Sequence, residues 1–180
     1  MASMAAKRLL PFKFDLMAAY ELGNVFHYIM ENLFDLDAED RTKEAALELL
    51  DEVEANGLGR NGDKYKASFQ DPDVKARWRA ECEANIDGYF ELEDPTKVRV
   101  VATELDLRGI EVGGVPFNGK IDRLDESPSG GLQIRDYKTG KYKDDSFGDP
   151  HGNQLRLYKA ALAVPPDYKD KKVTSADLLY

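Results

Sequence analysis

The sequence predicts an α/β or α+β protein in which helices flank a mixed central sheet of about four strands. Apolar side chains recur at helical spacing over residues 14–92, whereas residues 97–138 carry the alternating or continuous apolar runs that are typical of strands. A further helical segment, over residues 150–164, precedes a last strand over residues 172–180. Short links favour an antiparallel meander for the first three strands, and the intervening helix favours a crossover that makes the last pair parallel.

The expected helices combine apolar residues at helical spacing with polar capping residues, and they cover residues 14–34, 43–55 and, starting at Asp71 or Asp73, the segment to about residue 90. The first helix is expected to be well buried and loosened near Gly23. Thr42 is a suitable N-cap for the second helix, and Gly57 has the chemistry of a C-cap. Residues 1–13 are expected to be flexible.

The expected strands cover residues 98–108, 115–125, 132–138 and 172–180. Turn residues separate the first three: residues 109–114 form one turn region, and Ser127-Pro-Ser-Gly-Gly131 forms another. Asp149 and Pro150 have the residue types of an N-cap and a first helical position, which places the start of the crossover helix there.

The chain has 180 residues, which predicts one domain with a helical part over residues 14–92 and a sheet with its crossover helix over residues 97–180. Its single cysteine, Cys82, excludes an internal disulfide and a four-cysteine cluster within one chain. No apolar run approaches the roughly 20 residues that span a bilayer, and the N-terminus lacks the pattern of a secretory signal. We therefore expect a cytoplasmic protein with no membrane partner.

Two aspartates and a lysine lie at the expected ends of neighbouring strands. Period-two alternation places Asp136 and Lys138 on one face of a strand, and Asp122 on the preceding strand can lie beside Asp136. Two close carboxylates repel each other, and a divalent cation such as Mg²⁺, which prefers oxygen ligands, offsets that repulsion. The lysine ammonium suits a phosphate. This combination predicts a metal-dependent nuclease core, in which a metal-activated water attacks a phosphodiester.

Each of these residues has a more ordinary interpretation when it is taken alone. The aspartates and their basic neighbours, Arg123 and Lys138, would most often form surface ion pairs. The remaining candidates would be an interior histidine, a solvated strand residue and two residues on one helix face, and they are His27, Glu104 and the pair Gln154 and Tyr158. The prediction therefore depends on the joint occurrence and the order of these residues.

Three motifs follow one another along the chain: Gly119-Lys-Ile-Asp-Arg-Leu-Asp125, Asp136-Tyr-Lys-Thr-Gly140 and Gln154-x-x-x-Tyr158. With Gly23-Asn-Val-Phe-His27 upstream, this order resembles the RecB-type branch of the PD-(D/E)XK nucleases, over roughly residues 20–180. The resemblance implies a restriction-endonuclease-like fold. It also implies a Mg²⁺- or Mn²⁺-dependent DNA exonuclease of repair or recombination, with DNA and a helicase or recombination complex as partners.

The resemblance further implies a role for each residue. The metal ligands would be an imidazole, two carboxylates and a backbone carbonyl, from His27, Asp122, Asp136 and Tyr137. Lys138 would be the catalytic lysine, and Gln154 and Tyr158 would orient the lysine, the substrate phosphate or the DNA end. Glu104 matches a frequent acidic position on the first strand. Ile121 stands where the motif has its proline, so Asp122 alone represents that pair.

Many relatives in this branch hold an iron–sulfur cluster on four cysteines, whereas this chain has only Cys82, so no cluster is expected here. The alternative to a DNase is a non-catalytic nucleic-acid-binding or assembly module that retains the nuclease fold. The formal net charge of −9 favours this alternative slightly. The complete set of site residues favours the enzyme, because a degenerate site would have lost some of them.

A nuclease needs a local basic track rather than a basic total. Such a track could combine cations from both ends of the chain, and its candidates are Lys7, Arg8, Arg135, residues 138–143, Arg156 and Lys159. Four of them are the expected contacts to DNA phosphates, namely Lys141, Lys143, Arg156 and Lys159.

Overall fold

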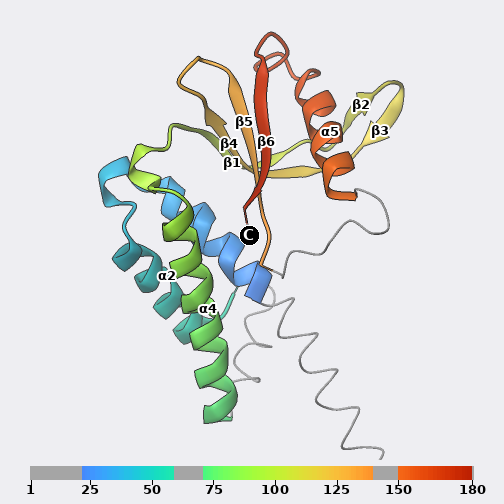
Figure 1. Cartoon of the computed structure of the whole chain (residues 1–180). Helices are drawn as coiled ribbons and strands as arrows, with labels where there is room; N and C mark the ends of the chain where they lie inside the picture. Colours follow the sequence, from blue (N-terminus) through green and yellow to red (C-terminus); the bar gives the residue numbers. More distant parts are fainter. Residues whose placement is uncertain (1–21, 59–70, 140–149, 180) are drawn as a thin grey trace, which may run out of the picture.

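The structure is a computed structural model that describes residues 22–58, 71–139 and 150–179 (Figure 1). The expectations for residues 1–13, for the beginning of the first helix and for the Asp149 N-cap lie outside these residues, as do Lys141 and Lys143. Across the described ranges, no helix combines the length and the apolar character that crossing a membrane requires.

Three helices form a layer beside the sheet, and they cover residues 22–35, α2 (Lys43–Asn56) and α4 (Pro72–Leu92) (Figure 1). The Thr42 side chain accepts a hydrogen bond from the backbone N–H of Ala45 at 3.1 Å, and Gly57 ends α2 with a φ of 75°, so both predicted caps are confirmed. Gly23 is helical, but the described residues begin at residue 22, so the expected loosening near Gly23 stays a prediction. The 3₁₀ turns η1 (Ala38–Asp40) and η3 (Pro95–Lys97) contact each other, where the chain approaches α2 and where it leaves α4.

The central sheet has the predicted mixed topology, with strand order β1-β4-β5-β6. Its strands are β1 (Val100–Asp106), β4 (Lys120–Glu126), β5 (Leu132–Tyr137) and β6 (Val173–Leu179). The first three pair antiparallel as a meander, and β6 runs parallel to β5 after the crossover through α5 (Pro150–Leu162). The predicted α+β, restriction-endonuclease-like class is therefore confirmed.

The expected strand over residues 115–125 is wrong as a single element. It divides into β3 (Val115–Phe117) and β4, and β3 pairs with β2 (Ile110–Val112) in a separate hairpin. The turn between β2 and β3 needs Gly113 and Gly114 at φ 60° and 80°, as tight hairpins do. At Gly119 an added Cβ would lie 2.8 Å from the Phe117 ring. Only glycine therefore fits at the point where the chain passes this ring between β3 and β4.

Two apolar cores adjoin the sheet, one on each side. The helical layer packs against one face, in a core that includes Phe26, Trp78, Tyr89 and Tyr137. Helix α5 packs against the other face, in a core that includes Leu132, Ile134, Tyr158, Ala161 and Leu162. Each fully buried aliphatic side chain stabilises the fold by about 1.5–3 kcal/mol. Alternation along β5 sends Tyr137 to the helical layer and leaves Asp136 on the face of α5.

Candidate metal centre

Asp122 and Asp136 lie near one edge of the sheet, because β4 begins where the antiparallel β5 ends. The register pairs Arg123 with Arg135, so the next step along the ladder places the two aspartates opposite each other. The backbone N–H of Tyr137 donates to Asp122 Oδ2 at 2.7 Å. Both carboxylates are buried, with exposed fractions of 9% and 3%. The fold thus brings together the two acids whose adjacency the alternation predicts.

His27 reaches this edge from the first helix. Its Nδ1 atom lies 3.4 Å from Asp122 Oδ1 and 3.8 Å from Glu104 Oε1. One donor atom from each of these three residues lies within 4.8 Å of the other two. The interior-histidine interpretation is therefore wrong, because the His27 side chain is 34% exposed and faces two carboxylates.

Glu104 is not the solvated strand residue of the ordinary interpretation. Its side chain is only 14% exposed and forms an ion pair with Lys120. Its φ of 48° is the one positive φ of a non-glycine residue in the described part of the chain. Such backbone strain costs about 1–3 kcal/mol and concentrates at functional sites. This conformation supports a functional role for Glu104 beside Asp122 and His27.

Lys138 and Gln154 both contact Asp136. The Lys138 ammonium pairs with Asp136 Oδ2. The ordinary interpretation expects a surface ion pair, whereas the carboxylate of this pair is buried. From α5, Gln154 Nε2 donates to Asp136 Oδ1 at 3.3 Å and to the Tyr158 hydroxyl at 2.9 Å. The ring of Tyr158 packs edge-on against Phe117 of the small hairpin. The i, i+4 pair on α5 therefore orients one of the acids.

The donor set fits a divalent cation. An imidazole nitrogen and carboxylate oxygens, from His27, Glu104 and Asp122, are ligand types that divalent metal ions accept. Asp136 lies beside this group and is engaged by Lys138. Its predicted role as a ligand, and that of the Tyr137 carbonyl, stay predictions.

Comparison with known families identifies the group to which these residues belong. The family model described as the PD-(D/E)XK nuclease superfamily matches residues 5–180. The chain belongs to the PD-(D/E)XK nuclease superfamily. A search of curated proteins finds no match. Nucleases of this superfamily generally use divalent metals, which agrees with the donor set at the sheet edge.

A buried arginine, which sequence reasoning missed, follows Asp122 on β4 and points to the opposite face of the sheet. Arg123 has no exposed surface, and its guanidinium donates two hydrogen bonds of 2.9 Å to Asp125 and lies 2.6 Å from Glu93 Oε1. It also donates to the Tyr137 hydroxyl at 2.8 Å and lies 4.3 Å from the centre of the Phe34 ring. Arg123 therefore does not form the surface ion pair with Asp122 that the ordinary interpretation suggests. A charged residue within a central strand was the available signal.

Only part of the predicted basic track lies within the described residues. Arg135 is unsuited to it, because its guanidinium bonds to Asp125 and Asp177 and the side chain is 19% exposed. Arg156 and Lys159 lie on the exposed side of α5, where Arg156 donates to Asn153 at 2.8 Å. Their contact with DNA stays a prediction.

The carboxyl of Asp136 has a pKa above its usual range because burial penalises its charged form, and the charge of Asp122 adds to this effect against Lys138. In the metal-free protein the folded state therefore holds this proton more tightly than the unfolded chain. The contribution of Asp136 to the free energy of unfolding therefore falls as the pH rises through the pKa that this carboxyl has in the folded state.

Asp136→Asn is therefore expected to remove part of this pH dependence and to stabilise the metal-free protein at neutral pH. The neutral amide keeps the size of the side chain without the buried charge. Urea unfolding in EDTA measures both effects. The pH is varied from about 4 to 7, which covers the ordinary pKa values of carboxyl and imidazole groups. Asp170→Asn, at an exposed carboxylate before β6, is the matched control. An unfolding free energy below that of the wild type at neutral pH would contradict this account.

Proposed function

We propose that this chain is a Mg²⁺- or Mn²⁺-dependent deoxyribonuclease that hydrolyses phosphodiester bonds, and that it acts as a RecB-type exonuclease in DNA repair or recombination. The observation that carries the proposal is the gathering of His27, Glu104 and Asp122 beside the Asp136–Lys138 pair at one edge of the sheet. Superfamily membership supports the nuclease class. A helicase or recombination complex is the proposed partner.

The side chains of this site would have different roles in hydrolysis. A divalent cation held by His27, Asp122 and the neighbouring carboxylates would polarise the phosphoryl group and lower the pKa of a water molecule. Lys138, which pairs with Asp136 in the absence of substrate, can donate hydrogen bonds to phosphate oxygens as negative charge develops on them. Gln154 holds the Asp136 carboxylate in place through its amide.

Incubation with linear single- and double-stranded DNA, and with closed circular DNA, tests the proposal. Cleavage is expected with Mg²⁺ or Mn²⁺ and none with EDTA, and circular DNA is expected to resist an exonuclease. Lys138→Met and Asp136→Ala are expected to abolish cleavage, whereas Lys169→Met, at an exposed lysine before β6, is the matched control. Metal-independent cleavage, or equal cleavage by all variants, would refute the proposal.

One observation favours a non-catalytic DNA-binding or assembly module as the second candidate. Two lysines already pair with carboxylates of the centre, Lys120 with Glu104 and Lys138 with Asp136. A site neutralised internally in this way can persist without a cation. DNA binding without cleavage, together with no heat of Mn²⁺ binding in calorimetry, is the result that would select this candidate.

Lys159→Gln and Arg156→Gln are each expected to weaken DNA binding uniformly across sequences. A cation that contacts a phosphate releases a counterion from the DNA on binding. Its loss is therefore expected to make the negative slope of log affinity against log salt shallower by roughly 0.7–0.9. A salt titration by fluorescence anisotropy measures this slope, with Lys169→Gln as the control on a different segment. An unchanged slope in both variants would remove α5 from the DNA track.

A further inference from the structure

Lys120 neutralises one of the donor residues of the metal centre. It begins β4, two residues before Asp122, and its ammonium forms an ion pair with Glu104 Oε2. The other carboxylate oxygen, Glu104 Oε1, lies 3.8 Å from His27 Nδ1. Glu104 therefore presents one oxygen to a lysine and the other to the histidine of the group that can hold a divalent cation.

A divalent cation bound at Glu104 would weaken this ion pair. Two positive charges beside one carboxylate repel each other, and the repulsion is stronger where little solvent reaches, as at the 14% exposed side chain of Glu104. The Lys120 side chain is 55% exposed, so its ammonium can move to solvent or to another anion. Lys120 and a divalent cation are therefore expected to compete for the charge of Glu104.

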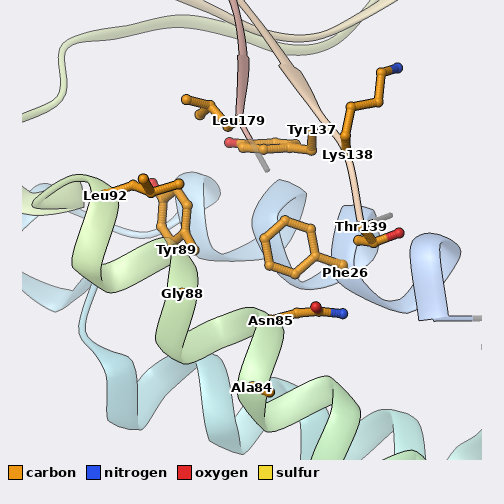
Figure 2. Close-up of a pocket in the computed structure, with 10 residues that line it drawn as sticks. All are labelled: Phe26, Ala84, Asn85, Gly88, Tyr89, Leu92, Tyr137, Lys138, Thr139 and Leu179. Atoms are coloured by element: carbon orange, nitrogen blue, oxygen red, sulfur yellow. The ribbon is translucent and has the colours of Figure 1, made fainter. Parts of the chain in front are cut away.

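The second lysine of the centre is less free to leave its partner. The Lys138 side chain is only 25% exposed, and it pairs with the buried carboxylate of Asp136. Figure 2 shows that this side chain points away from the rings of Phe26 and Tyr137, so it lies on the side of β5 that carries the metal centre. Of the two lysines, Lys120 is therefore the one whose ion pair can be exchanged.

The released ammonium would line a polar pocket of about 430 Å³ beside the centre. The other lining residues surround the end of β1 and the beginning of β4, and they are Asp106, Arg108, Asn118 and Gly119. Asp106 accepts hydrogen bonds from the backbone N–H and the Nε atom of Arg108, at 2.9 Å and 2.7 Å, so these two charges balance within the wall.

The charge of Lys120 is balanced by a residue outside this wall, because its partner Glu104 does not line the pocket. A cation that neutralises Glu104 would therefore leave the pocket with an uncompensated positive charge. This charge favours an anion, and a lysine ammonium with its three donors suits a phosphate. The asparagine amide of the wall can donate a further hydrogen bond to such a ligand.

The pocket follows the metal centre along the two outer strands of the meander that carry it. Lys120 and Asp122 are two residues apart on β4, as are Glu104 and Asp106 on β1. Two residues of a strand span about 7 Å, and their side chains share a face of the sheet. A DNA strand that crosses the centre carries further phosphates on either side of the cleaved one, and the pocket lies where one of them would pass.

We propose that Lys120 couples the occupancy of the metal centre to DNA binding. It neutralises Glu104 when no cation is bound, and it binds a neighbouring DNA phosphate in the pocket once a cation takes over Glu104. The inference rests on the proposed deoxyribonuclease function and adds an order of assembly to it, in which the metal prepares the centre for the strand. Linkage requires that DNA strengthens metal binding by the same factor.

Calorimetric titration with Mn²⁺ in the absence of DNA tests the competition. Lys120→Met removes the ammonium but keeps the aliphatic stem, and Mn²⁺ affinity is expected to rise about fivefold, at the low end of the range for coupled sites. Lys120→Arg keeps the charge and is expected to stay close to the wild type. Lys97→Met is the matched control, because Lys97 pairs with Asp94 at the surface with 81% exposure.

Fluorescence anisotropy with labelled DNA, in EDTA and in saturating Mn²⁺, tests the release to a phosphate. Lys138→Met, which is expected not to cleave, is the parent of every variant in this experiment, and a gel verifies that the DNA stays intact. In EDTA, the addition of Lys120→Met is expected to leave DNA affinity unchanged. In Mn²⁺ it is expected to lower DNA affinity about fivefold and to make the negative salt slope shallower by roughly 0.7–0.9.

Three outcomes would overturn the coupling and leave the nuclease function intact. Unchanged or weaker Mn²⁺ affinity in Lys120→Met would show that the ammonium does not compete for Glu104. An equal loss of DNA affinity in EDTA and in Mn²⁺ would make Lys120 a phosphate contact that is independent of the metal. No loss in either condition would remove the pocket from the path of the DNA. Lys120→Gln repeats each measurement should the methionine variant fold poorly. Absence of both Mn²⁺ binding and cleavage in the wild type would instead refute the proposed function itself.

Discussion

Asp122→Asn is expected to lower metal-dependent DNA cleavage about a thousandfold while the protein stays folded, since the Lewis-acid contribution of a bound cation amounts to several kcal/mol. Asp122 contributes the carboxylate closest to His27 Nδ1, at 3.4 Å, and belongs to the compact group of donors. The amide oxygen of asparagine can still accept the hydrogen bond from the Tyr137 N–H, which preserves the contact between β4 and β5. The lost charge therefore affects cation binding more than folding.

Initial cleavage rates over a range of Mn²⁺ concentrations, with calorimetric Mn²⁺ binding alongside, measure this effect. Affinity for Mn²⁺ is expected to fall with the rate, and excess metal should restore only part of the activity. Asp170→Asn carries the same change at an exposed carboxylate before β6, and it is expected to behave as the wild type. A variant within a few fold of the wild-type rate would show that Asp122 is not a ligand.

The placement of Asp122, Asp136 and Lys138 could be predicted because it follows from local periodicity. A strand sends alternate residues to one face, and a meander brings the ends of consecutive strands together. The same reasoning places Gln154 and Tyr158 on one face of α5, four residues apart. These relations need only the chain direction and the element type, which the apolar pattern indicates.

The resemblance named Glu104 as a candidate, but the backbone conformation that holds it beside Asp122 and His27 could not be predicted from the sequence. Its φ of 48° departs from the strand region, and no propensity of glutamate indicates that conformation. The break in the strand at Gly119 likewise depends on rings from Phe117 and from Tyr158, which comes from a distant helix. Contacts between segments far apart in the chain, rather than local preference, determine both features.

The burial of Arg123, on the other face of the sheet, also could not be predicted from local sequence. An arginine within a strand is usually expected at the surface, and local sequence favours an ion pair with a neighbour. Here the helical layer covers that face and supplies Glu93, Tyr89 and the Phe34 ring to the guanidinium. This network joins the layer that carries His27 to the strand that carries Asp122.

Arg123→Met is accordingly expected to lower the free energy of unfolding by about 3–5 kcal/mol, the usual result of removing one partner from a buried ion pair. The change leaves the carboxylates of Asp125 and Glu93 without their main counter-charge. Urea unfolding of the metal-free protein measures the loss. Arg99→Met is the matched control, because Arg99 pairs with Glu126 at the surface with 69% exposure and is expected to contribute less than about 1 kcal/mol.

The pH dependence of this loss separates the buried ion pair from simple packing. Burial raises the pKa of the Asp125 carboxyl even in the intact protein, and removal of the Arg123 charge raises it further. A carboxyl whose folded-state pKa is raised binds its proton more tightly when folded, so the variant loses stability as the pH rises through that pKa. The deficit of Arg123→Met relative to the wild type is therefore expected to be smaller at about pH 4.5 than at about pH 7. A deficit that is equal at both pH values would mean that lost packing around Phe34, rather than an uncompensated carboxylate, causes the destabilisation.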